Sequence, residues 1–119
     1  MNNAYLLKMT SAEVHSSLEV SDLMLFQDNA KAIAIKDILN NFLVSNSSII
    51  EESVKNHYKL FYENEKDLVF LLSSYLNEDT AGWLVREIGL NCYTYDMGIS
   101  MNGFEVVEVK YVENKGWCK

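Results

Sequence analysis

The last third of the chain has the composition of β-strands, and a turn signal divides it. Residues 92–101 and 104–112 are rich in β-branched, aromatic and other apolar side chains, which favour strands. Asn102-Gly103 stands between the two stretches. Asn-Gly is the strongest short signal for a two-residue hairpin turn, because both positions of a type I′ turn need positive φ. The sequence therefore predicts a C-terminal hairpin in which Met101 pairs with Phe104.

This register puts apolar side chains on both faces of the predicted hairpin. One face gathers Tyr93, Tyr95, Met97, Ile99, Met101, Phe104, Val106 and Val112, and the other holds Val107, Val109 and Tyr111. Either both faces are covered, or one is an exposed adhesive surface. A bulge at Gly98 would shift the register.

The most regular helical pattern lies in the first half of the chain. Apolar residues at positions 35, 38, 39, 42 and 43 follow the spacing that lines one face of a helix. Asp28 or Asn29 is the expected N-cap. An alternative stays open, in which residues 23–26 and 31–35 pair as a hairpin and the helix begins only after Lys36.

The N-terminus predicts a strand, since Ala4–Met9 alternates loosely between two sides. Thr10 or Ser11 then has the side-chain oxygen to cap a short helix through Leu18. The next apolar run is Leu23–Phe26, and its pattern does not distinguish between helix and strand.

Further helices are expected between residues 48 and 89. Ser48-Ile-Ile-Glu51 is a capping box. It opens a helix whose apolar face is Ile50, Val54, Tyr58 and Phe61. The next helix runs over about residues 65–76, and its broad apolar face predicts that it is the most buried. Asp79 then caps a short helix that carries Leu84 and Ile88 and ends at Gly89.

These patterns predict a single α+β domain over residues 1–119. A chain of 119 residues suits one domain and is too short for two ordinary ones. The domain is expected to hold a small antiparallel sheet, made of the C-terminal Asn-Gly hairpin and an N-terminal strand, packed by about four helices.

The charge of the chain is acidic and excludes several kinds of partner. The net charge is −7, the sequence pI is about 4.7, and Arg86 is the only arginine. Direct binding to nucleic acid needs clustered Lys and Arg, and attraction to anionic lipid needs the same, so we expect neither. The longest apolar run, Leu68–Leu72, is far shorter than a membrane span. Residues 61–119 carry ten acidic and five basic side chains, so most of the excess acid lies in the second half.

The sequence contains no motif for catalysis, a cofactor or a metal. His15 and His57, the only histidines, belong to neither an HExxH nor a CxxC pattern. Cys92 is expected in a strand as a small inert thiol, and Cys118 in a loose tail. GxSxG and glycine-rich phosphate loops do not occur. We expect no enzyme activity, no cofactor and no metal. Two cysteines make no disulfide framework and favour reduced thiols in the cytoplasm.

Two acidic clusters lie at the ends of the helix predicted over residues 65–76. The first is Glu63, Glu65 and Asp67, and the second is Glu78 and Asp79. If that helix is straight, its length separates the clusters by about 18 Å at 1.5 Å per residue. Aromatic side chains beside complementary charge give affinity and fast association, which suits a basic protein partner. The predicted partner-binding residues are Glu63, Glu65, Asp67, Glu78, Asp79, Trp83, Tyr95 and Asp96.

These features predict a small acidic inhibitor that neutralises a basic nuclease, toxin or nucleic-acid enzyme, of the immunity-protein, antitoxin or anti-defence type. One alternative is a homo-oligomeric adaptor or secretion-type chaperone, which would use the two-faced hairpin as a dimer interface or for strand addition. A second alternative is a small enzyme, which would need a pocket that gathers His15 or His57 with Cys92, Asp96 or Arg86.

Overall fold

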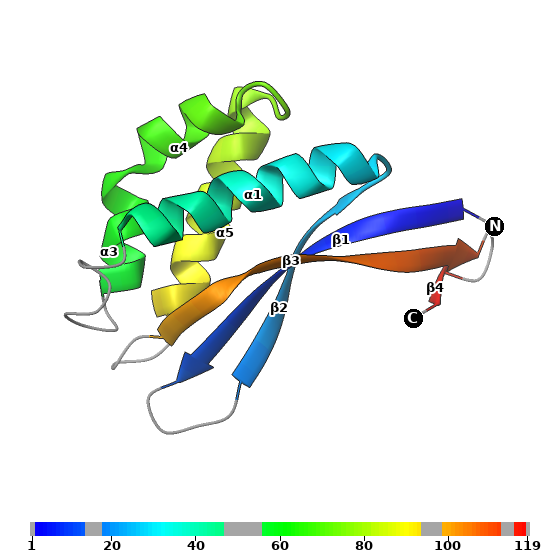
Figure 1. Cartoon of the computed structure of the whole chain (residues 1–119), viewed down its shortest axis with the longest axis horizontal. Coiled ribbons are helices and arrows are strands. Elements are labelled where there is room, and N and C mark those ends of the chain that lie inside the picture. The colour runs from blue at the N-terminus through cyan, green and yellow to red at the C-terminus, as the bar shows by residue number, and fades with distance from the viewer. Residues whose placement is uncertain (1, 14–17, 47–55, 94–98, 113–115, 119) are drawn as a thin grey trace.

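The computed structural model describes residues 2–13, 18–46, 56–93, 99–112 and 116–118 (Figure 1). It has an antiparallel sheet in the order β2-β1-β3-β4, with helices packed on one face. The α+β fold is therefore confirmed, as are the N-terminal and C-terminal strands. The strands are β1 (Asn2–Glu13), β2 (Leu18–Phe26), β3 (Ile99–Val112) and β4 (Gly116–Cys118). The helices in the described part of the chain are α1 (Asn29–Ser45), α3 (Asn56–Glu63), α4 (Glu65–Leu72) and α5 (Glu78–Tyr93).

Strand β1 is a central strand of the sheet and is longer than predicted. It pairs with β2 on one side and with β3 on the other, and both ladders extend past Ser11. The short helix expected from Thr10 or Ser11 to Leu18 is wrong, because residues 10–13 are strand. A capping side chain offers the backbone one local partner, whereas two neighbouring strands satisfy every N–H and C=O along it.

The predicted Asn-Gly hairpin turn is also wrong, since Asn102 and Gly103 lie inside the continuous strand β3. Thr10 pairs with Gly103 and Ser11 pairs with Met101, so Asn102 is an extra residue in β3. The two residues form a β-bulge, in which the positive φ of Gly103 (155°) serves the bulge and not a turn. The C-terminal hairpin lies further along the chain, where the end of β3 pairs with β4.

The side chain of Asn40 on α1 holds this bulge. Its Nδ2 donates to the Phe104 carbonyl (3.0 Å), and its Oδ1 accepts from the Phe104 N–H (2.9 Å). The amide thus serves both backbone groups of Phe104 as a neighbouring strand would. A Cβ on Gly103 would lie 3.2 Å from Asn40 Oδ1, which is a tight contact. Glycine at position 103 therefore suits both the positive φ and the close approach of Asn40.

Helix α1 begins where the sequence predicts. Asp28 Oδ1 accepts hydrogen bonds from the N–H groups of Ala30 (2.9 Å) and Lys31 (3.5 Å), as an N-cap does. The alternative hairpin of residues 23–26 with 31–35 is wrong, because α1 starts at Asn29 and residues 23–26 belong to β2. The predicted apolar face is confirmed, since Ile35, Leu39 and Leu43 are buried and Ile38 and Phe42 pack against the core.

The later helices have different bounds from those predicted. Helix α4 ends at Leu72, where the Ser73 hydroxyl donates to the Phe70 carbonyl (2.6 Å). The prediction that this helix is the most buried one is wrong, because only Leu68 and Leu72 of α4 are buried and its Phe70 side chain is 77% exposed. Helix α5 buries more apolar side chains: Ala81, Leu84, Val85 and Ile88. Helix α5 begins after Asn77, and not at an Asp79 cap, because Asn77 Oδ1 accepts from the Thr80 N–H (2.8 Å).

Two further predictions concern the ends of these helices. Helix α5 does not end at Gly89 but continues to Tyr93, so Cys92 lies in a helix and not in a strand. Glycine ends a helix only where the chain turns left-handed, and Gly89 has no such conformation. The capping box at residues 48–51 lies outside the described residues.

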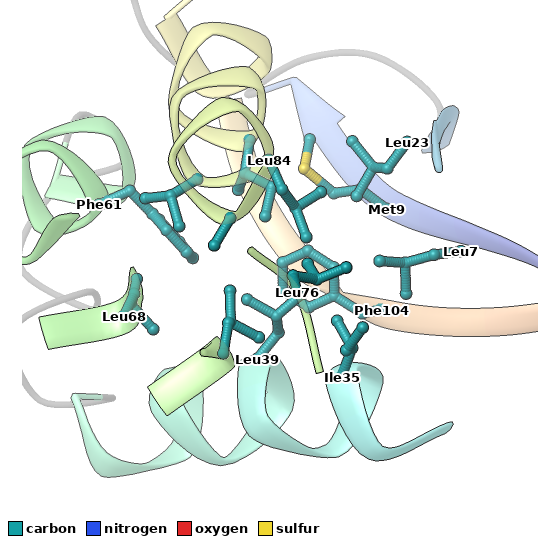
Figure 2. Packing of buried hydrophobic residues seen from close by; sticks show 14 of the residues in the cluster. Leu7, Met9, Leu23, Ile35, Leu39, Phe61, Leu68, Leu76, Leu84 and Phe104 are labelled. Atoms are coloured by element: carbon teal, nitrogen blue, oxygen red, sulfur yellow. The ribbon is translucent and has the colours of Figure 1, made fainter. Parts of the chain in front are cut away.

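One hydrophobic core joins the helices to the sheet (Figure 2). Leu7 of β1 and Phe104 of β3 meet Leu39 of α1 between the two layers. Phe61 of α3 is fully buried and connects the elements, because its ring centre lies 5.2 Å from that of Phe42 and 6.5 Å from that of Phe104. Tilted and edge-on ring pairs at these distances favour association beyond the area they bury.

The Asn40 side chain provides a first test of this fold. We expect Asn40→Ala to lower the free energy of unfolding by about 1–3 kcal/mol, because it leaves the half-buried N–H and C=O of Phe104 without a partner. Urea unfolding followed by circular dichroism measures this loss.

Asn41→Ala is the matched control for this test. Asn41 is the next residue of the same helix, so the two Asn→Ala changes have the same effect on helix propensity. Because Asn41 is exposed, its change removes no buried contact. We expect the control to change the free energy of unfolding by no more than about 0.5 kcal/mol. Equal losses in the two variants would show that Asn40 does not hold the bulge.

Candidate functional site

A hollow on the surface of the described residues lies between helices α4 and α5. Its volume is about 520 Å³. The two helices lie side by side at one end of the helical layer (Figure 1). Helix α4 and its C-cap contribute Glu65, Lys66, Val69, Phe70 and Ser73, and helix α5 contributes Glu78, Asp79, Gly82 and Arg86. We call this site the α4–α5 hollow.

The packing of the two helices decides which residues line this hollow. On α5, Ala81, Leu84 and Ile88 are buried in the core, at the spacing of one helical face. A neighbouring stripe of the same helix faces the hollow instead. It consists of Asp79, Gly82 and Arg86. On α4, Leu68 and Leu72 enter the core. The site therefore stands on two helices that are fixed by their opposite faces.

An ion pair spans the hollow between the two helices. Arg86 Nη1 lies 3.4 Å from Glu65 Oε2. The same guanidinium lies over Gly82, where an added Cβ would meet Arg86 Nη1 at 3.1 Å. The absence of a side chain at position 82 thus leaves room for the only arginine of the chain to reach α4.

The structure brings together three of the eight predicted partner-binding residues. Glu65, Glu78 and Asp79 line the α4–α5 hollow. They come from the two predicted acidic clusters, and they share one site because the chain turns back after Leu72. The other described members are exposed side chains outside the lining: Glu63, which pairs with Lys59 at 4.0 Å, and Asp67 and Trp83. Tyr95 and Asp96 lie outside the described residues.

Phe70 is a lining residue that the sequence analysis did not name. The pattern contains a signal that distinguishes it. Leu68 and Leu72 are four residues apart and are buried. Phe70 lies two residues from each of them, which is about 200° around the helix at 3.6 residues per turn. Its exposure follows from that position.

A second, smaller hollow lies next to the first. Its volume is about 180 Å³, and we call it the α3–α5 hollow. It shares Glu65 and Arg86 with the α4–α5 hollow. Its other lining residues are mostly apolar: Phe61, Tyr62, Val85, Gly89 and Leu90.

The chemistry of these two hollows suits binding by charge and apolar contact. Within the described ranges, no group of three or more His, Cys, Asp and Glu side chains is arranged to hold a metal ion. In the same part of the chain, no helix has the length and apolar character to span a membrane. The side chains of His15, His57 and Cys92 are outside the described set. No family model, curated protein or solved structure matches this chain.

The ion pair across the hollow is expected to add little to stability. We expect Arg86→Met to change the free energy of unfolding by less than about 1 kcal/mol, because exposed pairs are screened by water and salt. By contrast, Leu84→Ala on the same helix empties a fully buried site and should cost about 2–5 kcal/mol. Urea unfolding of both variants checks this, and a loss for Arg86→Met as large as that for Leu84→Ala would contradict it.

Proposed function

We propose that this chain is a small acidic protein that binds and neutralises a basic protein, such as a nuclease, a toxin or a nucleic-acid enzyme. In class it would be an immunity protein, an antitoxin or an anti-defence protein, acting in the cytoplasm. The observation that carries the proposal is the α4–α5 hollow, where Glu65, Glu78 and Asp79 lie beside the exposed Phe70.

The charge around the hollow supports a basic partner. Residues 63–87 contain six acidic and two basic side chains, a net charge of −4 out of −7 for the chain. A concentrated field of one sign steers an oppositely charged protein toward the surface and raises the association rate. The lining itself carries three carboxylates against Lys66 and Arg86, a net charge of −1. Arg86 pairs with Glu65, so Glu78 and Asp79 form the negative end of the site.

The aromatic side chain supports a protein partner in preference to a small cation. Phe70 is 77% exposed, which leaves a large ring in water at the rim of an acidic hollow. A buried aromatic anchor with polar surroundings is the usual arrangement of an energetic hot spot in a protein interface. Because Phe70 lies on a helix that the core holds through Leu68 and Leu72, little ordering of the site is needed on binding.

The proposal is tested by capture and inhibition with a charge-reversal variant. The wild-type chain and the variant Glu78→Lys/Asp79→Lys are each immobilised. The protein that is retained is identified and purified, and its activity is then measured in the presence of the wild type and of the variant. We expect the wild type to retain a basic protein and inhibit its activity, and the reversed variant to associate at least about tenfold more slowly. The wild-type association rate should fall steeply with added salt.

The matched control is Glu105→Lys/Glu108→Lys, which changes the net charge by the same amount at two exposed positions of β3. It should keep both retention and inhibition. If the control loses binding as much as the reversed variant does, overall charge and not the hollow accounts for it. The proposal would be refuted if the wild-type chain retains no basic protein, or retains one whose activity it does not inhibit.

A homo-oligomeric adaptor is the second candidate, and the outer face of the sheet favours it. Ala4, Leu6 and Val109 form a small cluster separate from the main core. The register places Leu25 and Val107 beside Leu6, and these two side chains are 42% and 37% exposed. Light scattering separates the candidates, since a strict monomer at tens of micromolar would exclude the second.

A further inference from the structure

The two hollows lie one after the other along helix α5, and we call them together the trough. They meet at the Glu65–Arg86 ion pair, which lines both. From Asp79 to Leu90 the trough follows eleven residues of α5, or about 16 Å at 1.5 Å per residue. Its character changes along that length. One end is acidic at Glu78 and Asp79, and the other is apolar, where Phe61, Val85 and Leu90 line the smaller hollow.

We propose that this trough binds an amphipathic helix of the partner, with cationic side chains at Glu78 and Asp79 and an apolar anchor about three turns away in the α3–α5 hollow. The inference rests on the proposed function and adds to it the shape and side-chain pattern of the segment that is bound.

The walls and floor of the trough favour a helix as the occupant. Helices α3 and α4 form one wall and α5 forms the other, and a groove between helices is a common seat for an amphipathic helix. Gly82 and Gly89 lie seven residues apart along the lining, which is about two turns of α5. Gly89 adds no side chain to the floor, so a docked helix can approach α5 closely there, whereas the Arg86 guanidinium covers Gly82.

The rim provides apolar contacts at the end away from the acids. Tyr62 is 71% exposed and Leu90 is 57% exposed, and both line the α3–α5 hollow. A leucine-sized side chain placed between them would cover apolar surface on both sides. Tyrosine and leucine at this rim thus select an apolar residue, whereas Glu78 and Asp79 at the far end select cations.

The ion pair in the middle determines where the cations of the partner lie. Arg86 bonds Glu65 and holds a positive charge over Gly82, at the centre of the trough. Because this charge is paired with Glu65, the centre of the trough offers a lysine or arginine of the partner no net attraction, and such a side chain is accepted only at the acidic end. The expected pattern is therefore one basic turn and one apolar residue on the same helical face, with no cation between them.

Synthetic peptides test this pattern directly. The matched peptide is a helical alanine-rich 16-mer with two lysines in its first turn and a leucine eleven residues after the second, on the same face. The shifted peptide has the same composition, but its leucine follows by nine residues and so lies on the opposite face. Fluorescence anisotropy with labelled peptides measures the affinity of the full chain for each.

We expect the wild type to bind the matched peptide about tenfold more tightly than the shifted one, because only the matched leucine reaches the α3–α5 hollow. Leu90→Lys should remove that preference while leaving the fold intact, since Leu90 is exposed. Glu78→Lys/Asp79→Lys should weaken both peptides by about tenfold or more. The β3 control Glu105→Lys/Glu108→Lys should weaken either by less than about twofold, because its charges lie outside the trough.

Equal affinity for the matched and shifted peptides would overturn the inference. So would a preference that survives Leu90→Lys. These failures are distinct from failure of the proposed function. A basic protein that is captured and inhibited through Glu78 and Asp79, with no preference between peptides, would leave the function standing and refute only the helical mode of binding.

Discussion

The two hydrogen bonds between Asn40 and the backbone of Phe104 are the constraint on which the arrangement of this protein depends. They tie helix α1 to strand β3 across the core. They also satisfy both polar groups of Phe104, so that this stretch of β3 needs no further strand beside it. With the bulge held at Asn102 and Gly103, β3 runs on as one strand and lies along the whole of β1. A turn at the same two residues would have divided β3 and removed that pairing.

The core builds on this frame. Phe104 presents its ring to the helical layer, where it meets Phe61, and Phe61 in turn contacts Phe42 on the same helix as Asn40. Helix α1 is therefore held to the sheet through aromatic packing and through the two Asn40 hydrogen bonds, and α3 is held through the ring of Phe61. Leu68 and Leu72 of α4 and Leu84 and Ile88 of α5 belong to the same close-packed core.

The candidate site lies on the side of helices α4 and α5 that faces away from the core. Helices α4 and α5 bury one stripe each, and the adjacent stripes form the α4–α5 hollow. Phe70, Glu78 and Asp79 are exposed, so they bury little surface in the folded chain. Surface groups of this kind are free to serve recognition, whereas the buried residues behind them determine where they are held.

Local patterns in the sequence are enough to predict the features that depend on neighbours a few residues apart. The apolar face of α1 and the Asp28 cap follow from helical spacing and local hydrogen bonding, and the excess of acid follows from composition. Three of the hollow's carboxylates were also among the predicted residues, because acids near helix ends are visible in the sequence. Phe70 was not, although its spacing from Leu68 and Leu72 indicates an outward position.

Whether Asn102-Gly103 is a turn or a bulge depends on contacts that exist only in the folded chain. The residue that settles it, Asn40, lies 64 positions away from Phe104 in the chain, so no local pattern contains the interaction. Asn-Gly supplies a backbone that tolerates positive φ, and that conformation suits a hairpin turn and a bulge alike. The strand β1 on one side and the Asn40 amide on the other satisfy the backbone of the extended form, and the signal for a turn is overridden.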